Sequence, residues 1–365
     1  MSSSTGTESQ LWVTVLAGGI GARFWPASTL SRPKPLLSFG SEQPLIRDAV
    51  ERAQSLVDVE HLSILAGAHL IHPFRAVLPE LPKDSFWSEP AARGTGPALT
   101  WAAHRLHESD PQAVLISLHA DHQITPETAF PPILRRAVDI AIREDVLLSI
   151  AVEPTRPETG YGYILPGEPF AETDLLEAFR IAEFVEKPTE TTANGYIAHG
   201  YLWNTGIFVL PVARFLDEVR RHAPEIARSL PYLDRGDEEG FFDQAHAISV
   251  DQAVFERSDR VGAVRADFRW DDVGGWEALS RILPLDSAGN CVVGEAHTIA
   301  SGKSIVWAED GPIVLFGVEG LVVVRTGDVT LVASRERAHE LKQLLAELPG
   351  ALQGTPRRGA GEADP

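Results

Sequence analysis

The sequence is poor in sulfur and in positive charge. Its 365 residues include one cysteine, Cys291, and one methionine. A single cysteine excludes an intramolecular disulfide and suits a reducing compartment, so we expect a cytoplasmic protein. The 51 acidic residues outnumber the 32 lysines and arginines, and the formal charge at pH 7 is −19. This charge argues against a nucleic-acid or membrane partner, because both attract basic surfaces.

Long hydrophobic runs are also missing, and no signal peptide is visible in the first residues. The longest apolar runs, such as residues 313–318, are far shorter than the roughly 20 residues that a transmembrane helix needs. The first ten residues, MSSSTGTESQ, contain neither the basic nor the apolar stretch of a signal peptide. We therefore expect no membrane attachment. With 44% hydrophobic residues, the chain can bury a large core.

Strand and helix patterns alternate through the first part of the chain. They lie at residues 11–17, 44–57, 61–66, 70–78, 97–106, 113–118, 129–143 and 146–152. This order predicts an α/β domain with a mostly parallel, mixed sheet and helices on both faces. Ligands bind such sheets at the carboxyl ends of the strands.

The pattern changes to short β runs beyond residue 290. We count six of these runs, and an amphipathic helix over residues 335–348 follows them. They predict a small all-β domain that ends in a helix. The expected domains are a disordered N-terminus over 1–10, a large α/β domain over 11–285, the small β domain over 286–350 and a disordered tail over 351–365.

Glycines follow the first predicted strand, which ends near Leu16. The sequence continues as Gly18-Gly19-Ile20-Gly21, then Arg23, and later Pro33-Lys34-Pro35. Glycine lets backbone N–H groups approach a phosphate because no Cβ stands in the way. Arg23 and Lys34 supply positive charge for a triphosphate, and the prolines restrict the backbone around Lys34. The P-loop and dinucleotide fingerprints are both absent, so a plain glycine turn remains an alternative.

Two carboxylates that follow predicted strands are candidate metal ligands. Asp121, after the strand at 113–118, suits Mg²⁺, a hard cation that prefers oxygen ligands and substrate phosphates. The surrounding sequence His-Ala-Asp-His also allows zinc, although Ser117 stands where the metallo-hydrolase pattern has another histidine. Asp272 and its neighbour Asp271 follow another strand, and they could instead cap a helix that starts at Gly275.

Several segments in order resemble one family. The stretch GGIGARFWPAS…RPKP is similar to the N-terminal loop of sugar-nucleotide pyrophosphorylases, which are nucleotidyltransferases that act on sugar 1-phosphates. The Phe24-Trp25-Pro26 variant most resembles the mannose-1-phosphate guanylyltransferases, with Ala22 where the family usually has Ser, Thr or Glu. The resemblance covers residues 11 to 348. It implies a Rossmann-like, GT-A-like nucleotidyltransferase domain and a short C-terminal domain that is β-helix-like.

The resemblance also implies the catalytic residues. The family's Asp-His segment matches Asp121, and its Trp-x-Asp-x-Gly-x-Trp segment matches residues 270–276. Asp121 and Asp272 are therefore expected to hold Mg²⁺. Arg23 is expected to hold the leaving diphosphate, and Lys34 the α-phosphate.

Further segments resemble the family's substrate loops. Residues 89–98 are similar to the guanylyltransferase loop Glu-Pro-x-x-Arg-Asn-Thr-Ala-Pro-Ala, with Gly94 and Gly96 replacing Asn and Ala, and Thr95 could also cap the next helix. Residues 184–188 resemble the sugar-phosphate motif, although a Glu-Lys pair alone is usually solvated surface. The residues expected to bind GTP are Leu16, Gly18, Gly19, Gly21, Glu89, Arg93, Thr95 and Pro97. Those expected to bind mannose 1-phosphate are Gly162, Glu186, Lys187 and Asn204.

The activity implied is that of a mannose-1-phosphate guanylyltransferase, which makes GDP-mannose and diphosphate. Alternatives are another sugar-1-phosphate nucleotidyltransferase, using thymidylyl or uridylyl transfer, and a non-catalytic subunit that binds sugar nucleotides. The small β domain could support a homodimer. We expect no appended sugar isomerase, because the chain ends soon after Leu348.

Overall fold

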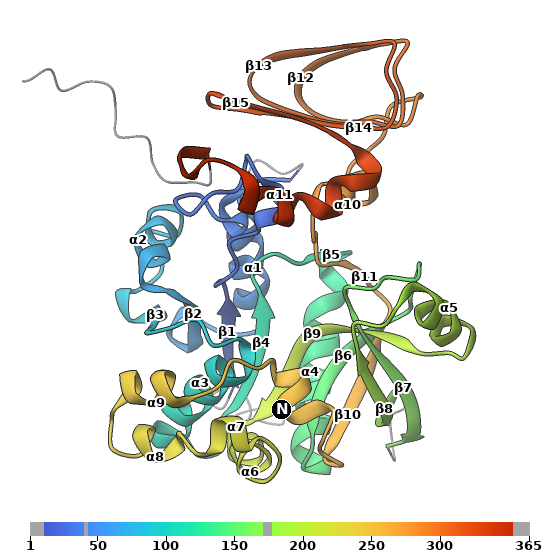
Figure 1. The fold of residues 1–365 in the computed structure, drawn as a ribbon. Coiled ribbons are helices and arrows are strands. Elements are labelled where there is room, and N and C mark those ends of the chain that lie inside the picture. The colour runs from blue at the N-terminus through green and yellow to red at the C-terminus, as the bar shows by residue number, and fades with distance from the viewer. Residues whose placement is uncertain (1–10, 40–42, 171–176, 353–365) are drawn as a thin grey trace, which may run out of the picture. The chain divides into compact units, whose positions relative to one another are not determined.

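The structure, a computed structural model, describes residues 11–39, 43–170 and 177–352 (Figure 1). The first unit contains Met1–Gly18, Ala49–Ala120 and Ile124–Trp270, and the second contains Gly19–Asp48, Asp121–Gln123 and Asp271–Pro365. The predicted disordered segments are 1–10 and 351–365. Residues 1–10 and 353–365 lie outside the described residues, whereas Ala351 and Leu352 belong to a short 3₁₀ helix, Gly350–Leu352. The domain boundary at 285/286 stays a prediction. Among the described residues, no helix is long and apolar enough to cross a membrane.

A nine-stranded sheet forms the centre of the first unit, in the order β3-β2-β1-β4-β9-β6-β10-β8-β7. Its strands are β1 (Leu11–Leu16), β2 (Leu62–Gly67), β3 (Phe86–Glu89), β4 (Val114–His119), β6 (Leu147–Val152), β7 (Gly162–Pro169), β8 (Ala178–Glu186), β9 (Leu202–Pro211) and β10 (Val261–Ala266). β1 to β4 pair in parallel, as do β6 and β10, whereas β9 runs antiparallel to β4 and β6. The expected mixed α/β sheet is confirmed.

Helices alternate with the strands of this sheet. They are α1 (Leu45–Gln54), α2 (Ala68–Val77), α3 (Thr95–Ser109), α4 (Phe130–Glu144), α5 (Glu190–Ala198), α6 (Val212–His222), α7 (Pro224–Ala227), α8 (Leu230–Leu233) and α9 (Glu238–Gln244). α3 and α6 bury their apolar faces together in one large core cluster with alternate residues of the strands, such as Phe208 and Leu210. α4 packs against β6, β9 and β10 with residues spaced three and four apart, among them Leu134, Ala137 and Ala141.

The residues Asn204-Thr205-Gly206 look like a turn in the sequence but lie inside β9. The pairing of β6 with β9 shifts between Ser149 and Ala151, and Gly206 there has a φ of 71°. A β-bulge takes up extra residues in a strand and often needs a glycine in this conformation. The turn-like composition therefore marks a bulge that holds Asn204 next to β7.

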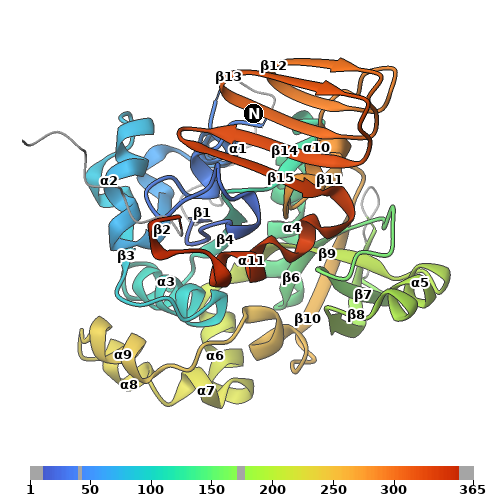
Figure 2. The ribbon, with the colours of Figure 1, turned by 45° about the horizontal axis from the view of Figure 1, so that its top comes forward.

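The second unit contains the predicted small β domain. Its strands β12 (Cys291–Ile299), β13 (Ile305–Phe316), β14 (Leu321–Thr326) and β15 (Val329–Ser334) lie side by side in that order (Figure 2). The first three strands are parallel and β15 is antiparallel to β14. The expectation of six short strands is wrong, since the described residues here form four. β12 continues through an irregularity between Gly294 and Ala296, so two runs make one strand.

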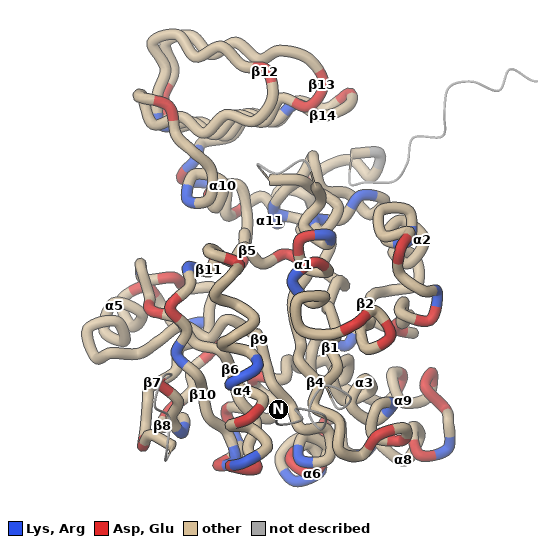
Figure 3. Tube along the Cα trace, turned by 180° about the vertical axis from the view of Figure 1, so that it is seen from behind, with Lys and Arg blue, Asp and Glu red and all other residues tan. Residues whose placement is uncertain are grey.

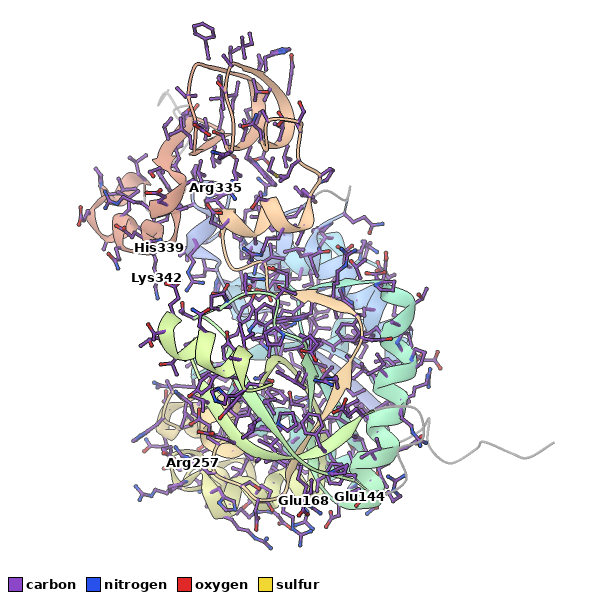
Figure 4. The ribbon with its side chains drawn as sticks, turned by 90° about the vertical axis from the view of Figure 1, so that its right-hand side faces the viewer. Glu144, Glu168, Arg257, Arg335, His339 and Lys342 are labelled. Carbon is purple, nitrogen blue, oxygen red and sulfur yellow. The ribbon has the colours of Figure 1, made fainter. Side chains whose placement is uncertain are left out.

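The last helical segment packs within the second unit. A 3₁₀ helix over Arg335–Glu340 leads into α11 (Leu341–Glu347), and α10 (Trp276–Ile282) lies earlier in the chain. Arg335, His339 and Lys342 follow one another along this segment (Figure 4). Arg335 Nε donates to Glu277 of α10 at 2.9 Å, which ties the end of the chain to that helix. Finally, β5 (Gln123–Thr125) and β11 (Arg269–Asp271) pair with each other, and the chain passes between the two units within these strands.

Candidate active site

Lys34 lies at the centre of a polar cluster in the second unit. Its side chain is 7% exposed, and its backbone N–H donates to the Ile20 carbonyl oxygen at 3.0 Å. The ammonium donates to Asp121 Oδ2 and to the backbone oxygen of Asp272, each at 2.6 Å. Gly21, with a φ of 75°, permits this arrangement, since a Cβ there would lie 2.3 Å from the Lys34 Cβ. Three distant segments of the sequence therefore meet at one ammonium group.

The two adjacent acids at 271–272 differ in their partners. The Asp271 carboxylate accepts from Arg281 at 2.7 and 3.0 Å and from the backbone N–H of Val273 at 2.8 Å. It therefore stabilises the local turn. The Asp272 carboxylate lies beside Gly274, where an added Cβ would be 3.0 and 3.1 Å from its two oxygens. The assignment of Asp272 as the metal ligand stays a prediction.

Arg23 and the aromatic residues of the N-terminal loop pack onto the segment after these acids. Arg23 Nη1 donates to the Gly274 carbonyl oxygen at 3.3 Å, and Trp276 Nε1 donates to the Trp25 carbonyl oxygen at 3.2 Å. α10 begins at Trp276 without a side-chain cap. The alternative that the acids at 271–272 cap this helix is therefore wrong. The four residues predicted to be catalytic all belong to this unit.

The oxygen atoms around Lys34 fit a divalent cation. An Asp121 carboxylate oxygen and the Asp272 carbonyl oxygen already contact a positive group, and the Asp272 carboxylate lies close to Gly274, where a Cβ would be 3.0 Å from one of its oxygens. Carboxylate and carbonyl oxygens are ligands that Mg²⁺ prefers. Within the short segment 119–122, His119, Asp121 and His122 also offer ligand atoms within 4.8 Å of one another. Since imidazole suits zinc, the zinc alternative stays open.

Glu186, Gly162 and Asn204 form a row across three antiparallel strands of the first unit. Gly162 pairs with Glu186 of β8 on one side and with Asn204 of β9 on the other. A Cβ on Gly162 would lie 2.7 Å from Glu186 Oε2 and 3.3 Å from the Asn204 Cβ. The missing side chain of Gly162 thus lets the Glu186 carboxylate and the Asn204 side chain both lie close to this position. Such convergent polar groups are suited to binding sugar hydroxyls.

Lys187 follows this row directly. Its φ is 51°, and its backbone N–H donates to the Tyr161 carbonyl oxygen at 3.1 Å. The ammonium forms an ion pair with Glu186 and is 63% exposed, whereas the Glu186 side chain is 12% exposed. The sequence-based alternative of a solvated pair therefore describes the lysine but not the glutamate.

Glu89 and Gly18 stand near each other at the carboxyl ends of their strands. A Cβ on Gly18 would lie 3.7 Å from Glu89 Oε1. Burial raises the pKa of the Glu89 carboxyl to about 7. A strongly shifted carboxyl at the end of a strand is a functional candidate on physical grounds.

The loop after Glu89 is held by a later segment of the first unit. Arg93 Nε donates to the Phe242 carbonyl oxygen at 2.7 Å, and Thr95 Oγ1 accepts from the backbone N–H of Val250 at 3.0 Å. α3 starts at Thr95 without a side-chain cap. The alternative that Thr95 caps this helix is therefore wrong, and its hydroxyl instead binds the segment around Val250.

The remaining residues predicted to bind nucleotide have simpler surroundings. Leu16 ends β1, and Gly18 after it is exposed. Pro97 is buried in the first turn of α3. In the second unit, a Cβ on Gly19 would meet no atom within 4 Å, so packing within the protein does not require this glycine.

Comparison with known proteins places the chain in a family. A nucleotidyl transferase model matches residues 13–288, and a model of the MannoseP isomerase/GMP-like beta-helix domain matches residues 294–348. The mannose-1-phosphate guanylyltransferase of Escherichia coli strain K12 is 33% identical over 93% of this chain and 74% of its own length. Mannose-1-phosphate guanylyltransferase ManC of Salmonella typhimurium strain LT2 is 34% identical with the same coverage. The chain belongs to the mannose-1-phosphate guanylyltransferase family.

A solved structure supports the same membership. The crystal structure of mannose-1-phosphate geranyltransferase from Thermus thermophilus has a TM-score of 0.85 and 32% identity, and the match covers 93% of this chain and 99% of that one. The expected family and fold class are thus confirmed, including the β-helix-like C-terminal domain. As a member of the guanylyltransferase family, the chain is a nucleotidyltransferase.

The two departures from the guanylyltransferase loop have a packing reason. A Cβ on either Gly94 or Gly96 would lie 2.8 Å from the Ile248 carbonyl oxygen. The backbone N–H of Gly96 donates to that oxygen at 3.0 Å, and the N–H of Ile248 donates to the Arg93 carbonyl oxygen at 3.1 Å. The glycines therefore allow a second backbone to close onto the loop. The residues near Gly94 and Gly96 in the sequence do not predict this contact.

Sequence reasoning missed Asp251. This residue opens a π-helical turn, Asp251–Phe255, and its Oδ1 accepts from Asn204 Nδ2 at 2.7 Å. Burial, and then the negative charge of Glu186, raise the pKa of Asp251 to about 7. No motif marks it, because its neighbours have ordinary helical spacing and its partner lies on a distant strand.

We expect Glu89→Gln to flatten the pH dependence of stability. Burial raises the pKa of Glu89 from 4.5 to about 7, so between these values the folded protein keeps a proton that the unfolded chain releases. This group therefore lowers the free energy of unfolding as the pH rises from about 4.5 to about 7. Glutamine does not titrate and removes that contribution. Urea titrations at about pH 5.5 and about pH 7.5 measure the difference.

The matched control for this prediction is Glu60→Gln, which changes an exposed glutamate. The control should show the same fall in the free energy of unfolding as the wild type. If Glu89→Gln shows the full wild-type fall as well, the buried carboxyl does not contribute to it.

Proposed function

We propose that the chain makes GDP-mannose and diphosphate from GTP and α-D-mannose 1-phosphate. An oxygen of the sugar phosphate would attack the α-phosphorus of GTP as the bond to the diphosphate breaks in line. The attacking oxygen is already ionised, so no general base is required. Positioning and charge neutralisation then supply most of the catalysis. The observation that carries the proposal is the Lys34 ammonium, which contacts both Asp121 and the backbone of Asp272.

The charged residues of the second unit would bind the phosphates. Lys34 is assigned to the α-phosphate and Arg23 to the leaving diphosphate. Asp121 and Asp272 would hold Mg²⁺, which when bound offsets the negative charge of the phosphates. The backbone of Gly18, Gly19 and Gly21 would approach the same phosphates. Local positive charge is needed here because the whole chain carries a formal charge of −19.

The residues of the first unit would bind the sugar and the base. Glu186 is assigned as an acceptor for sugar hydroxyls and Asn204 as a donor, and both lie next to Gly162. The exposed Lys187 would neutralise the sugar phosphate. The loop from Glu89 to Pro97, with Leu16, is assigned to GTP. A polar site that matches particular hydroxyls rejects analogues strongly, because their mismatched groups stay unpaired.

We also propose that the protein works in the cytoplasm and binds neither nucleic acid nor membrane. Its only cysteine, Cys291, is buried and free, which suits a reducing compartment. Acidic and basic residues are both spread along the trace, for example on α4 and α6 (Figure 3). The net negative charge disfavours nucleic acid and anionic membranes, which attract basic surfaces.

A substrate panel tests the proposed reaction. Five nucleoside triphosphates are combined with mannose 1-phosphate and glucose 1-phosphate, and diphosphate release is measured with Mg²⁺, with Zn²⁺ and with excess chelator. We expect the highest kcat/KM for GTP with mannose 1-phosphate and loss of turnover in chelator, since Asp121 and Asp272 fit a hard cation.

Each other result of the panel identifies an alternative. A preference for thymidine or uridine triphosphate with glucose 1-phosphate supports a different sugar nucleotidyltransferase. Binding of GDP-mannose without turnover supports a non-catalytic subunit. Restoration by Zn²⁺ alone replaces the magnesium assignment with the histidine-rich alternative at 119–122.

We expect Lys34→Ala and Lys34→Gln each to lower kcat by on the order of 10²–10³. Both variants remove the positive charge assigned to the α-phosphate, and glutamine keeps hydrogen-bond donors and much of the length. Circular dichroism checks that the variants remain folded, and steady-state kinetics gives kcat. Lys83→Ala, which changes an exposed lysine, is the control and should retain wild-type turnover. Near-normal kcat in folded Lys34→Gln would remove this charge from the mechanism.

We propose further that the protein is a homodimer. Ile299 and Phe316 are paired neighbours on β12 and β13 and are 54% and 74% exposed, with Val314 nearby at 63%. Exposed apolar side chains that gather on one face are typical of interaction surfaces. Sedimentation should give twice the chain mass of 39.7 kDa for the wild type and a monomer for Phe316→Asp. Ile142→Asp, on α4, is the matched control; a monomeric wild type contradicts the proposal.

A further inference from the structure

We propose that Asp251 is a positioning residue that fixes the carboxamide of Asn204 toward the sugar phosphate. The inference rests on the proposed function, because it assigns Asn204 to that substrate. Asp251 lies outside every motif that the resemblance uses. Its assignment comes from the hydrogen bonds around Asn204 and from the segment that carries Asp251.

The carboxamide of Asn204 has a defined orientation. Its Oδ1 accepts from Ser149 Oγ at 2.7 Å and from the backbone N–H of Gly206 at 3.1 Å. Its Nδ2 donates one hydrogen to Asp251 Oδ1 at 2.7 Å. An amide oxygen has two lone pairs, and an amide nitrogen has two hydrogens. The oxygen is therefore fully used, and the second hydrogen of Nδ2 is the donor that remains for a substrate oxygen.

This remaining donor belongs to a residue that lies next to Gly162 and near Glu186. The position that a Gly162 Cβ would take is 3.3 Å from the Asn204 Cβ and 2.7 Å from Glu186 Oε2. In the proposed site, a sugar hydroxyl would use the Glu186 carboxylate as an acceptor and the Asn204 amide as a donor. If the Asn204 carboxamide turned over, it would present an oxygen to the substrate instead of a hydrogen. The orientation of one side chain therefore decides which hydroxyl pattern fits.

A short backbone segment holds Asp251 in place. We call residues 248–251 the strap. The Ile248 carbonyl oxygen accepts from Gly96 at 3.0 Å, and the Val250 N–H donates to Thr95 Oγ1 at 3.0 Å. The strap is therefore anchored to the loop assigned to GTP before it reaches Asp251. The missing side chains of Gly94 and Gly96 are what allow this close contact.

The charge around Asp251 argues against a role in packing alone. Burial raises the pKa of this carboxyl, and the negative charge of Glu186 raises it further. Lys187 opposes this effect, and burial and Glu186 also raise the pKa of Glu256 on the same turn. Keeping an acid in such a place costs stability. The geometry shows what this carboxyl does there, since its Oδ1 accepts from the Asn204 amide at 2.7 Å.

Steady-state kinetics of the full chain tests the inference. We compare Asp251→Ala, Asp251→Asn, Asn204→Ala and the double alanine variant, with Asp259→Ala at an exposed aspartate as control. The expected result for Asp251→Ala is a KM for mannose 1-phosphate raised by roughly 10-fold or more, with the KM for GTP within about 2-fold. Asp251→Asn keeps an acceptor oxygen and should stay within about 3-fold of wild type.

The double variant shows whether Asp251 acts through Asn204. If it does, adding Asp251→Ala to Asn204→Ala should change the KM for the sugar phosphate by less than about 2-fold. An unchanged sugar-phosphate KM in Asp251→Ala overturns the inference, as does an equal rise in both KM values or full additivity in the double variant. If circular dichroism shows that Asp251→Ala does not fold, Asp251→Ser takes its place under the same criteria.

Failure of the proposed function is detected separately, with the wild type. If the wild type prefers another sugar phosphate, the KM comparison is made with that substrate. If it binds sugar phosphate without turnover, dissociation constants for mannose 1-phosphate replace KM. In either case the ratio between variant and wild type still decides the role of Asp251.

Discussion

The contacts of the buried Lys34 ammonium connect distant segments of the sequence within the second unit. A buried charge is costly unless oppositely charged and polar groups surround it. Here the Asp121 carboxylate and the Asp272 carbonyl oxygen satisfy it, each at 2.6 Å. These contacts join the glycine loop, the turn after β4 and the segment after β11 into one unit. In a strongly acidic chain, they also bring together the charged groups that the proposed phosphate transfer would use.

The absence of a side chain at Gly162, Gly94 and Gly96 lets other atoms of the first unit come close to these residues. At Gly162, a Cβ would lie 2.7 Å from Glu186 Oε2, and at Gly94 and Gly96 it would lie 2.8 Å from the Ile248 carbonyl oxygen. The first of these glycines lets Glu186 and Asn204 lie close to it, and both are proposed to bind the sugar. The other two make room for the strap. Only the identity of the neighbouring atoms distinguishes the two roles.

Some features could be predicted because they depend on local patterns. The alternation of strand and helix patterns predicts the mixed sheet, and the position of Asp121 after β4 follows from the end of a buried run. The pairing of Asp271 with Arg281 and the bulge at Gly206 could not be predicted, because each depends on a partner chosen by packing. The role of Asp251 could not be predicted for the same reason, because its partner Asn204 lies on β9, far away in the sequence. The six β runs counted in the sequence form four strands, because a strand can continue through an irregularity that interrupts its sequence pattern.

By itself, the sequence determined the class of the fold, the family, and the residue types available for binding phosphates and sugars. These follow from hydrophobic periodicity and from short motifs, which are properties of neighbouring residues. The tertiary structure alone decided which of those residues meet: Lys34 with Asp121 and the backbone of Asp272, and Asp251 with Asn204. It also decided that the Asp271 carboxylate stabilises the local turn, and that Gly94 and Gly96 leave room for the backbone of the strap. The reason is that hydrogen bonds and steric contacts act over a few ångströms in space, whatever the separation along the chain.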